Sequence, residues 1–327
     1  ESITSIKYNA PRDYSAQDRA VTAEDYKTLV KSLYANAQAV QVYGGEDAAV
    51  PDYGKVYISI KAKSGSNLTV VTKESIVQSL KSYAVASVTP VIIDPETTFI
   101  TLTVNFRYNS GLTVKDVTTL QTNVLNAITN YNNNTLESFV GMFRYSQLLQ
   151  TVNEADTSIL SNITTVKMYK LVTPTLSESL KYTVSFNNAL YNPHSGHNMT
   201  GGGIISSTGF KISDDDSVSE HFLDDNGSGV LRVYYLNGST RVYTDSTYGT
   251  VDYATGEVIL TSANITSISN VDGATSTTIR VFAVPSSNDI VPVRNQVLEI
   301  DTSNSTITGE VDGIVSGGSQ AGTTYTT

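Results

Sequence analysis

The sequence predicts an α+β protein with two small sheet-and-helix units, then an all-β module, then an extended C-terminal arm. A phrase typical of helix starts occurs three times in the first half of the chain, between runs that alternate apolar and polar residues as half-buried strands do. After Pro174 the helical period stops, and Gly, Asn, Asp and Ser separate short β-rich runs. The predicted divisions are an N-terminal arm or linker over 1–20, α+β units over 21–95 and 96–174, an all-β module over 175–297 and an arm over 298–327.

The repeated phrase is "VTAEDY" from Val21, "VTKESI" from Val71 and "LTVKDV" from Leu112. Its threonine fits the N-cap, where a side-chain oxygen accepts a hydrogen bond from an otherwise unpaired helix N–H. The polar residue three positions later completes a shortened capping box, and the flanking apolar residues, such as Val21 and Tyr26, fit a hydrophobic staple. The pattern predicts three amphipathic helices rather than a catalytic repeat. The predicted N-caps are Thr22, Thr72 and Thr113, and the predicted N3 residues are Asp25, Ser75 and Asp116.

Strands are predicted between and after these helices. "KVYISIKA" (55–62) and "FITLTVNFRY" (99–108) alternate apolar and polar residues, while "VTPVII" (88–93) and "TTVKMYKLV" (164–172) have weaker strand patterns, with a short helix over 146–152. In the β module, Asn237-Gly238 is a strong hairpin signal because this pair favours the type I′ turn.

Composition excludes several classes of function. The 327 residues include no Cys, so the chain has no disulfide, thiol nucleophile or Cys-ligated metal. There are 21 Lys and Arg against 31 Asp and Glu, without a basic cluster, so we expect no nucleic-acid partner. No apolar run reaches the roughly 18 residues of a membrane helix, so we expect a soluble chain with no membrane partner. The chain begins at Glu1 without Met, which suggests a piece of a longer protein.

Candidate metal and catalytic motifs are weak. His194 and His197 form "HSGH", but Pro193 and Gly196 indicate a loop without a third ligand, so we favour a plain polar loop over a metal site. The third histidine, His221, lies in the same irregular region of the β module.

The acidic sequence "DDNGSG" from Asp224 fits the first positions of a calcium loop, but Tyr235 occupies the position of the bidentate Glu. A solvated acidic turn is the favoured interpretation, with a calcium site of another type left open. "TGGGII" lacks the Lys and Ser/Thr of a phosphate loop, and no nucleophile motif is present. We predict no enzyme, no cofactor and no obligate metal.

Two groups of residues are candidates for protein contacts. The β module is rich in tyrosine, which is enriched at interfaces, and five tyrosines on neighbouring strands cannot all be in its core. The arm after Leu298 is too poor in apolar residues to form a core, yet some of them could dock on a partner. The candidate contact residues are Tyr234, Tyr235, Tyr243, Tyr248, Tyr253, Val311, Ile314 and Val315, with Tyr325 further along the arm.

The helix start "RAVTAEDYKTLV" and the later "VQVYGGEDAAVPDYGKVYISI" resemble the baseplate J-like family of contractile phage tails. "FITLTVNFRYNSGLTVKDVTTLQTNVLNAI", followed by the short helix "YSQLLQTV", is similar to the same family's downstream unit. The resemblance covers about residues 12–297. It implies that Arg19, Val21, Thr22, Asp25 and Tyr26 define the fold and have no catalytic role.

The resemblance further implies a structural protein of the virion, located in the tail baseplate and assembled in the host cytoplasm. Members of the family form the inner ring around the hub and transmit the change that triggers sheath contraction. Expected partners are the chain itself, as a homodimer and in a higher ring, and other baseplate wedge proteins. The alternative is a receptor- or glycan-binding tail module, which 20 Tyr favour and the lack of Trp disfavours.

Overall fold

The computed structural model describes residues 3–16, 19–48, 50–63, 67–197, 203–213, 215 and 220–313. By its internal contacts the chain divides into two compact units. The first comprises Glu1–Thr97, Thr135–Gly141 and Pro292–Leu298, and the second Thr98–Asn134, Met142–Val291 and Glu299–Thr327. Helices and strands occur in both units, so the protein has the α+β class predicted from its sequence.

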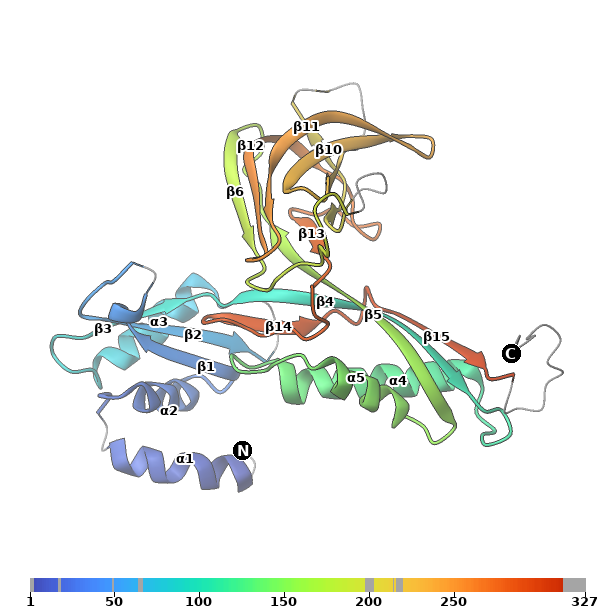
Figure 1. Ribbon diagram of the computed structural model, residues 1–327. Coiled ribbons are helices and arrows are strands. Elements are labelled where there is room, and N and C mark those ends of the chain that lie inside the picture. The colour runs from blue at the N-terminus through green and yellow to red at the C-terminus, as the bar shows by residue number, and fades with distance from the viewer. Residues whose placement is uncertain are drawn as a thin grey trace. The chain divides into compact units, whose positions relative to one another are not determined.

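The first unit is a three-stranded sheet with the order β1-β2-β3, to which α2 and α3 contribute buried side chains (Figure 1). Strands β1 and β2 are antiparallel, whereas β2 and β3 are parallel and are joined through α3. The core contains Tyr26 and Val30 of α2, Ile58 and Ile60 of β2, and Leu80 of α3. The elements are α1 (Ile3–Ala16), α2 (Ala23–Leu33), β1 (Ala37–Gly44), the 3-10 helix η1 (Gly45–Asp47), β2 (Lys55–Ala62), α3 (Val70–Lys81) and β3 (Thr89–Ile93).

A second sheet, most of whose residues belong to the second unit, has the order β14-β4-β5-β13-β7, and β15 pairs in parallel with β4. The alternating residues Ile100, Leu102, Val104 and Phe106 of β4 are fully buried, while the residues between them are at least partly exposed. Both α4 and α5 lie along the long β4–β5 pair (Figure 1). The elements are β4 (Glu96–Tyr108), α4 (Val117–Tyr131), the π-helical turn η2 (Asn132–Leu136), α5 (Tyr145–Asn153), β5 (Ile159–Val172), β7 (Ser206–Ser207), β13 (Ile279–Ala283), β14 (Gln296–Ile300) and β15 (Thr306–Val311).

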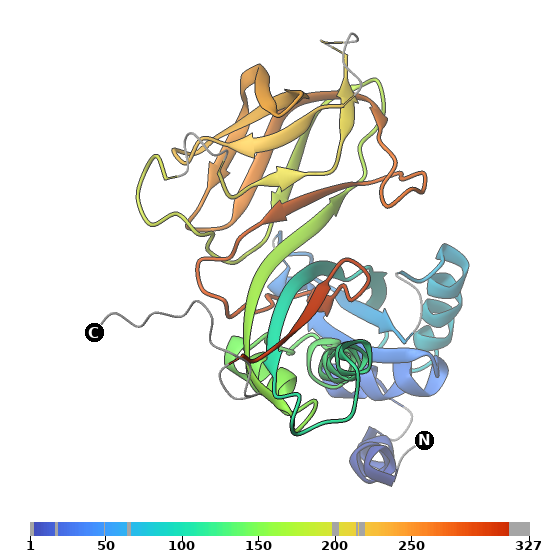
Figure 2. The same cartoon turned by 90° about the vertical axis from the view of Figure 1, so that its right-hand side faces the viewer.

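The remaining strands form a second six-stranded sheet, with the order β6-β12-β11-β10-β9 and β8 paired to β12. The main chains of Phe210 in β8 and His221, next to β9, exchange hydrogen bonds of 3.1 and 2.7 Å. This bridge links β8 to β9, so the five strands β8 to β12 close into a small barrel, whose curled strands are visible in Figure 2. The elements are β6 (Ser179–Ser185), β8 (Phe210–Ile212), β9 (Phe222–Asp225), β10 (Val230–Asn237), β11 (Thr240–Asp252) and β12 (Glu257–Ile268).

The structure differs from the predicted organisation in the terminal regions. Residues 3–16 of the expected N-terminal arm form α1. Residues 306–311 of the expected C-terminal arm form β15, because main-chain pairing with β4 does not require the apolar periodicity that the segment lacks.

The predicted division at 174/175 separates strands that share a sheet. Strand β13, from the expected all-β module, pairs with β5 of the second α+β unit. Whether 175–297 or either α+β unit folds alone stays a prediction.

Candidate functional site

The motif that opens α2 lies at a capped helix start. The Oγ1 of Thr22 accepts a hydrogen bond from the N–H of Asp25 (3.3 Å), and Oδ2 of Asp25 accepts from the N–H groups of Thr22 (2.8 Å) and Val21 (3.1 Å). Partial burial opposes ionisation of Asp25, but these N–H donors and the Thr22 hydroxyl together lower its pKa. Tyr26 is 2% exposed in the core, whereas Arg19 is exposed.

The hydrophobic staples predicted at the three helix starts are not formed as expected. Val21, Val71 and Leu112 are 66%, 75% and 63% exposed, so none buries its side chain against its helix. The reciprocal bonds of Thr22 and Asp25 fix the entry to α2 without a staple.

The predicted N-caps at Thr72 and Thr113 are wrong. Helix α3 begins one turn earlier, with Thr69 as its N-cap, and the N–H of Thr72 donates to Oγ1 of Thr69 (3.3 Å). Helix α4 begins later, with Asp116 as its N-cap, while Thr113 accepts from the N–H of Lys115 in the preceding turn. Both helices start where a short polar side chain faces the N–H three residues on, and such pairs recur in this Thr-rich sequence.

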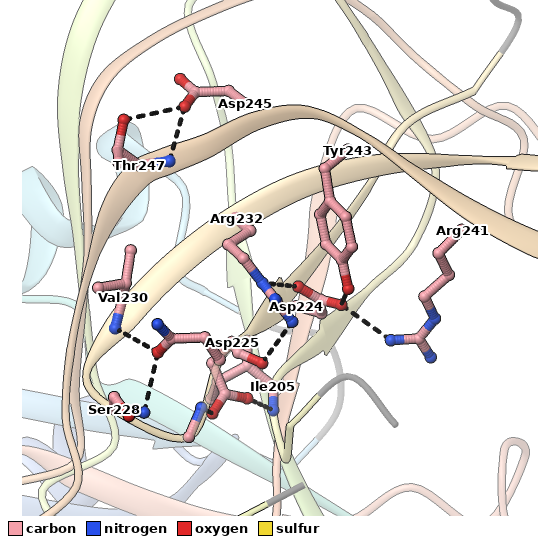
Figure 3. A network of polar contacts seen from close by, with 12 residues as sticks. Ile205, Asp224, Asp225, Ser228, Val230, Arg232, Arg241, Tyr243, Asp245 and Thr247 are labelled. Carbon is pink, nitrogen blue, oxygen red and sulfur yellow. Dashed lines mark hydrogen bonds and ion pairs between the residues drawn. The ribbon is translucent and has the colours of Figure 1, made fainter. Parts of the chain in front are cut away.

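A buried polar network lies between β9, β10 and β11 (Figure 3). Asp224 is 1% exposed, and its carboxylate accepts from Nε of Arg232 (2.9 Å), Nη1 of Arg241 (2.8 Å) and the hydroxyl of Tyr243 (2.8 Å). The two guanidinium groups also lie over aromatic rings, Arg232 over Tyr243 at 4.3 Å and Arg241 over Tyr234 at 4.6 Å. The buried negative charge is thus paired with two cations held in place by the hairpin.

The neighbouring carboxylate closes a second set of contacts. Oδ1 of Asp225 accepts from the N–H groups of Ile204 (2.6 Å) and Ile205 (2.8 Å), and Oδ2 accepts from the N–H of Gly227 (3.1 Å) and the hydroxyl of Tyr253 (2.5 Å). Burial, together with the adjacent carboxylate, raises the pKa of Tyr253. Asp225 therefore joins the segment at Ile204 and Ile205, just before β7, to the turn between β9 and β10.

This geometry explains the calcium-like sequence without a metal. The carboxylates of Asp224 and Asp225 face N–H and O–H donors, and Asn226 accepts from the N–H groups of Ser228 and Val230 in a local turn. The sequence alone does not identify Arg232 and Arg241 as the partners. The available signal was one arginine within each strand of the Asn-Gly hairpin, each followed by Val and Tyr.

The histidines fall into two places. Nδ1 of His197 lies 3.2 Å from Nε2 of His194, in a loop. His221 is fully buried at the barrel bridge, with Nε2 3.6 Å from Asp215, and burial lowers its pKa against the opposing effect of that carboxylate. Among the residues that the structure describes, no group of three or more His, Asp or Glu side chains is placed to hold a metal ion.

The tyrosines predicted as contact residues do not form one exposed patch. Tyr234 and Tyr248 are 8% and 6% exposed, and Tyr235 and Tyr253 are partly buried. Tyr243 is 38% exposed, but its hydroxyl binds Asp224. Most of these rings therefore stabilise the barrel itself.

On the C-terminal arm, Val311 is 50% exposed at the end of β15. Ile314, Val315 and Tyr325 lie outside the described residues. No helix in the described part of the chain has the length and apolar character needed to cross a membrane.

Two protein-family models match consecutive parts of this chain. Residues 22–93 match the family model for baseplate structural protein gp6, C-terminal domain I, and residues 96–171 match that for C-terminal domain III. The two matches follow each other along the chain and cover the helix–sheet layers of both units. They indicate a resemblance to the C-terminal part of a baseplate structural protein.

A particular relative is the baseplate wedge protein gp6 of Enterobacteria phage T4, which is 32% identical over 173 residues. The alignment covers 53% of this chain and 26% of that protein, so the chain resembles the C-terminal part of the wedge protein and corresponds to a fraction of its length. A looser likeness, with 14% identity and a TM-score of 0.38, relates 51% of this chain to 37% of a chain in the cryo-EM structure of the anti-feeding prophage baseplate, 6-fold symmetrised.

Proposed function

We propose that this chain is part of a structural protein of the baseplate wedge in a contractile phage tail, and that it is located in the virion. The main support is the pair of consecutive matches, over residues 22–93 and 96–171, to two C-terminal domains of one baseplate protein. The 32% identity to the T4 wedge protein over 173 residues supports the same role. In this role the chain acts through protein contacts rather than through catalysis.

The finer proposal is that the chain self-associates, contributes to the inner ring around the hub and passes on the conformational change at infection. A closed ring requires more than one contact surface on each subunit, because a single isologous patch stops at a dimer. The described residues offer separate surfaces of this kind, including the exposed groove beside α3 and the exposed end of β15 at Val311.

The experiment is reconstitution with the other wedge proteins of the same phage. We expect the chain to co-sediment with them in a complex larger than either component, and to form a dimer alone as its concentration rises. A chain that stays monomeric and sediments apart from every wedge protein would contradict the proposal.

A second candidate, glycan binding, is favoured by one cleft in the second unit. Its volume is about 530 Å³, and it combines hydroxyls of β4 and β5, such as Thr103 and Thr165, with the partly buried rings of Phe222 and Phe282. Hydroxyls and an apolar ring face are the groups that sugars contact. Binding on a glycan array that is abolished by Phe282→Ala would favour this function, and an array without signal would exclude it for the glycans present.

A further inference from the structure

Strand β3 is an outer strand with one unpaired edge. It pairs in parallel with β2 from Thr89 to Ile93, and no strand among the described residues pairs with its other side. Proteins usually protect such an edge with charges, prolines or bulges. Here Pro90 is the one protective residue, and it is followed by Val91, Ile92 and Ile93 without a charge. The main-chain groups of this edge are therefore suited to accept another strand.

A groove runs between this strand and α3. Its volume is about 590 Å³, and Val77 of the helix and Val91 and Ile92 of the strand line it. Val71, at one end of the groove, is 75% exposed. A strand added beside β3 would place alternate side chains against these apolar residues.

The groove has a charge at each end. Glu74 and Lys81 line it, both are exposed, and neither has an ion-pair partner among the described residues. They lie seven residues apart on α3, which is about 10 Å along the helix axis. Lys73, in the first turn of α3, binds Asp94 just after β3 (2.7 Å), so the helix runs antiparallel to the strand. Lys81 is consequently near the start of β3 and Glu74 near its end.

We propose that this groove receives an extended segment of a second polypeptide, which adds antiparallel to β3 as a fourth strand. The charges define the segment: a basic residue at its N-terminal end for Glu74, alternate β-branched apolar residues, and an acidic residue at its C-terminal end for Lys81. The inference deepens the proposed function and rests on it only for the source of the segment, a neighbouring baseplate protein.

The space above β3 favours a single strand over the β3 edge of a second copy. Side chains of α3 and Ile92 of β3 pack in the same core cluster, so the helix lies over the edge strand. Antiparallel pairing of two β3 edges sets the strands about 4.8 Å apart, whereas packed helices need 8–10 Å between axes. Pairing of two β3 edges would bring two α3 helices to the same side of the joined sheet, whereas a lone strand brings none.

The test uses the whole chain and two fluorescent peptides with blocked ends. The first has the order Thr-Lys-Thr-Val-Thr-Asp-Thr, which sets Lys and Asp about 14 Å apart on one face of an extended strand, and the second exchanges its Lys and Asp. We expect the first to bind at least about fivefold more tightly, because two pairs of exposed charges change from attraction to repulsion. Amide shifts in a TROSY spectrum should be confined to β3 and α3.

A double variant with reversed charges sharpens the test. Glu74→Lys with Lys81→Glu should invert the preference between the two peptides. The matched control, Glu24→Lys with Lys31→Glu, makes the same exchange at the same spacing on α2 and should leave the preference unchanged. Both changes lie on exposed helix positions, and circular dichroism verifies folding.

Equal affinity for the two peptides, no binding of either, or shifts outside β3 and α3 would overturn the inference. So would a homodimer in which the β3 amides become protected from exchange. None of these results bears on co-sedimentation with wedge proteins, so a failure here is distinguishable from a failure of the proposed function.

Discussion

The helix–sheet layer of the first unit and the barrel of the second are stabilised in different ways. In the first, a cluster of apolar side chains such as Val30, Ile58 and Leu80 is almost fully buried, and the polar contacts at helix ends join residues three or four apart. In the barrel, Asp224 and Asp225 are each 1% exposed and bind partners up to 28 residues away. A buried charge is stable only with its partners in place, so the barrel depends on specific pairs, whereas the layer depends on packed volume.

The largest expected effect breaks the barrel network. Asp224→Ala leaves Arg232 and Arg241 without their shared acceptor and should lower the free energy of unfolding by about 3–5 kcal/mol. Urea melts followed by tyrosine fluorescence measure this, since the chain has no Trp. Asp245→Ala, in strand β11 of the same hairpin, is the control, because the side-chain bonds described for Asp245 reach only to Thr247. A loss below about 1 kcal/mol would mean that the network contributes little.

The corresponding change in the first unit creates a cavity. Leu80→Ala removes a fully buried side chain of α3 and should cost about 3 kcal/mol in the same melts. Val70→Ala, on the same helix at 67% exposure, should change the free energy by less than about 0.5 kcal/mol. Similar losses for the two variants would show that packed volume is not the source of stability in this unit.

A third prediction concerns pH and tests a polar contact within the helix-covered part of the second unit. The Lys115 ammonium, together with the N–H of Ser158, lowers the pKa of Asp156 from 3.8 to about 2. Because the folded pKa is depressed, the stabilisation is present above about pH 4 and is lost as the pH falls toward 2. The side chain of Lys115 is 46% exposed, so solvent screening limits the effect to roughly 1 kcal/mol.

Chemical melts between pH 5 and pH 2 measure this contribution, with Asp156→Asn as the variant. The variant should show a shallower loss of stability over this interval than the wild type. Parallel curves for the two proteins would contradict the assignment.

The smallest effects concern helix caps. Thr22→Ala and Thr69→Ala should each cost about 1 kcal/mol, because each removes a hydrogen bond to the first turn of its helix. Thr113→Ala should cost less, because that side chain accepts in a turn before α4 and does not cap it. Equal costs at all three positions in denaturant melts would indicate that Thr113 caps α4, as the sequence predicted, and would contradict the N-cap at Asp116.

The sequence by itself determined the local structure and the class of the fold. The 3.6-residue period identified the helices that became α2, α3 and α4, and strict alternation identified β2 and β4, because burial on one face imposes these periods on the chain. It also identified the family resemblance, through the helix start at Thr22 and the order of the elements. Of the three predicted cap positions only that of α2 was correct, since more than one Thr or Asp lies close to the starts of α3 and α4.

Only the tertiary structure decided which distant groups meet. The sequence does not say that β15 pairs with β4, that β13 completes the sheet of β5, or that Phe210 bridges to His221 and closes the barrel. Nor does it place two arginines on Asp224. Strands pair through their main chains, and every strand offers the same N–H and C=O groups. Ion pairs form through charge, and every Asp offers the same charge. The choice among partners therefore follows from the folded geometry.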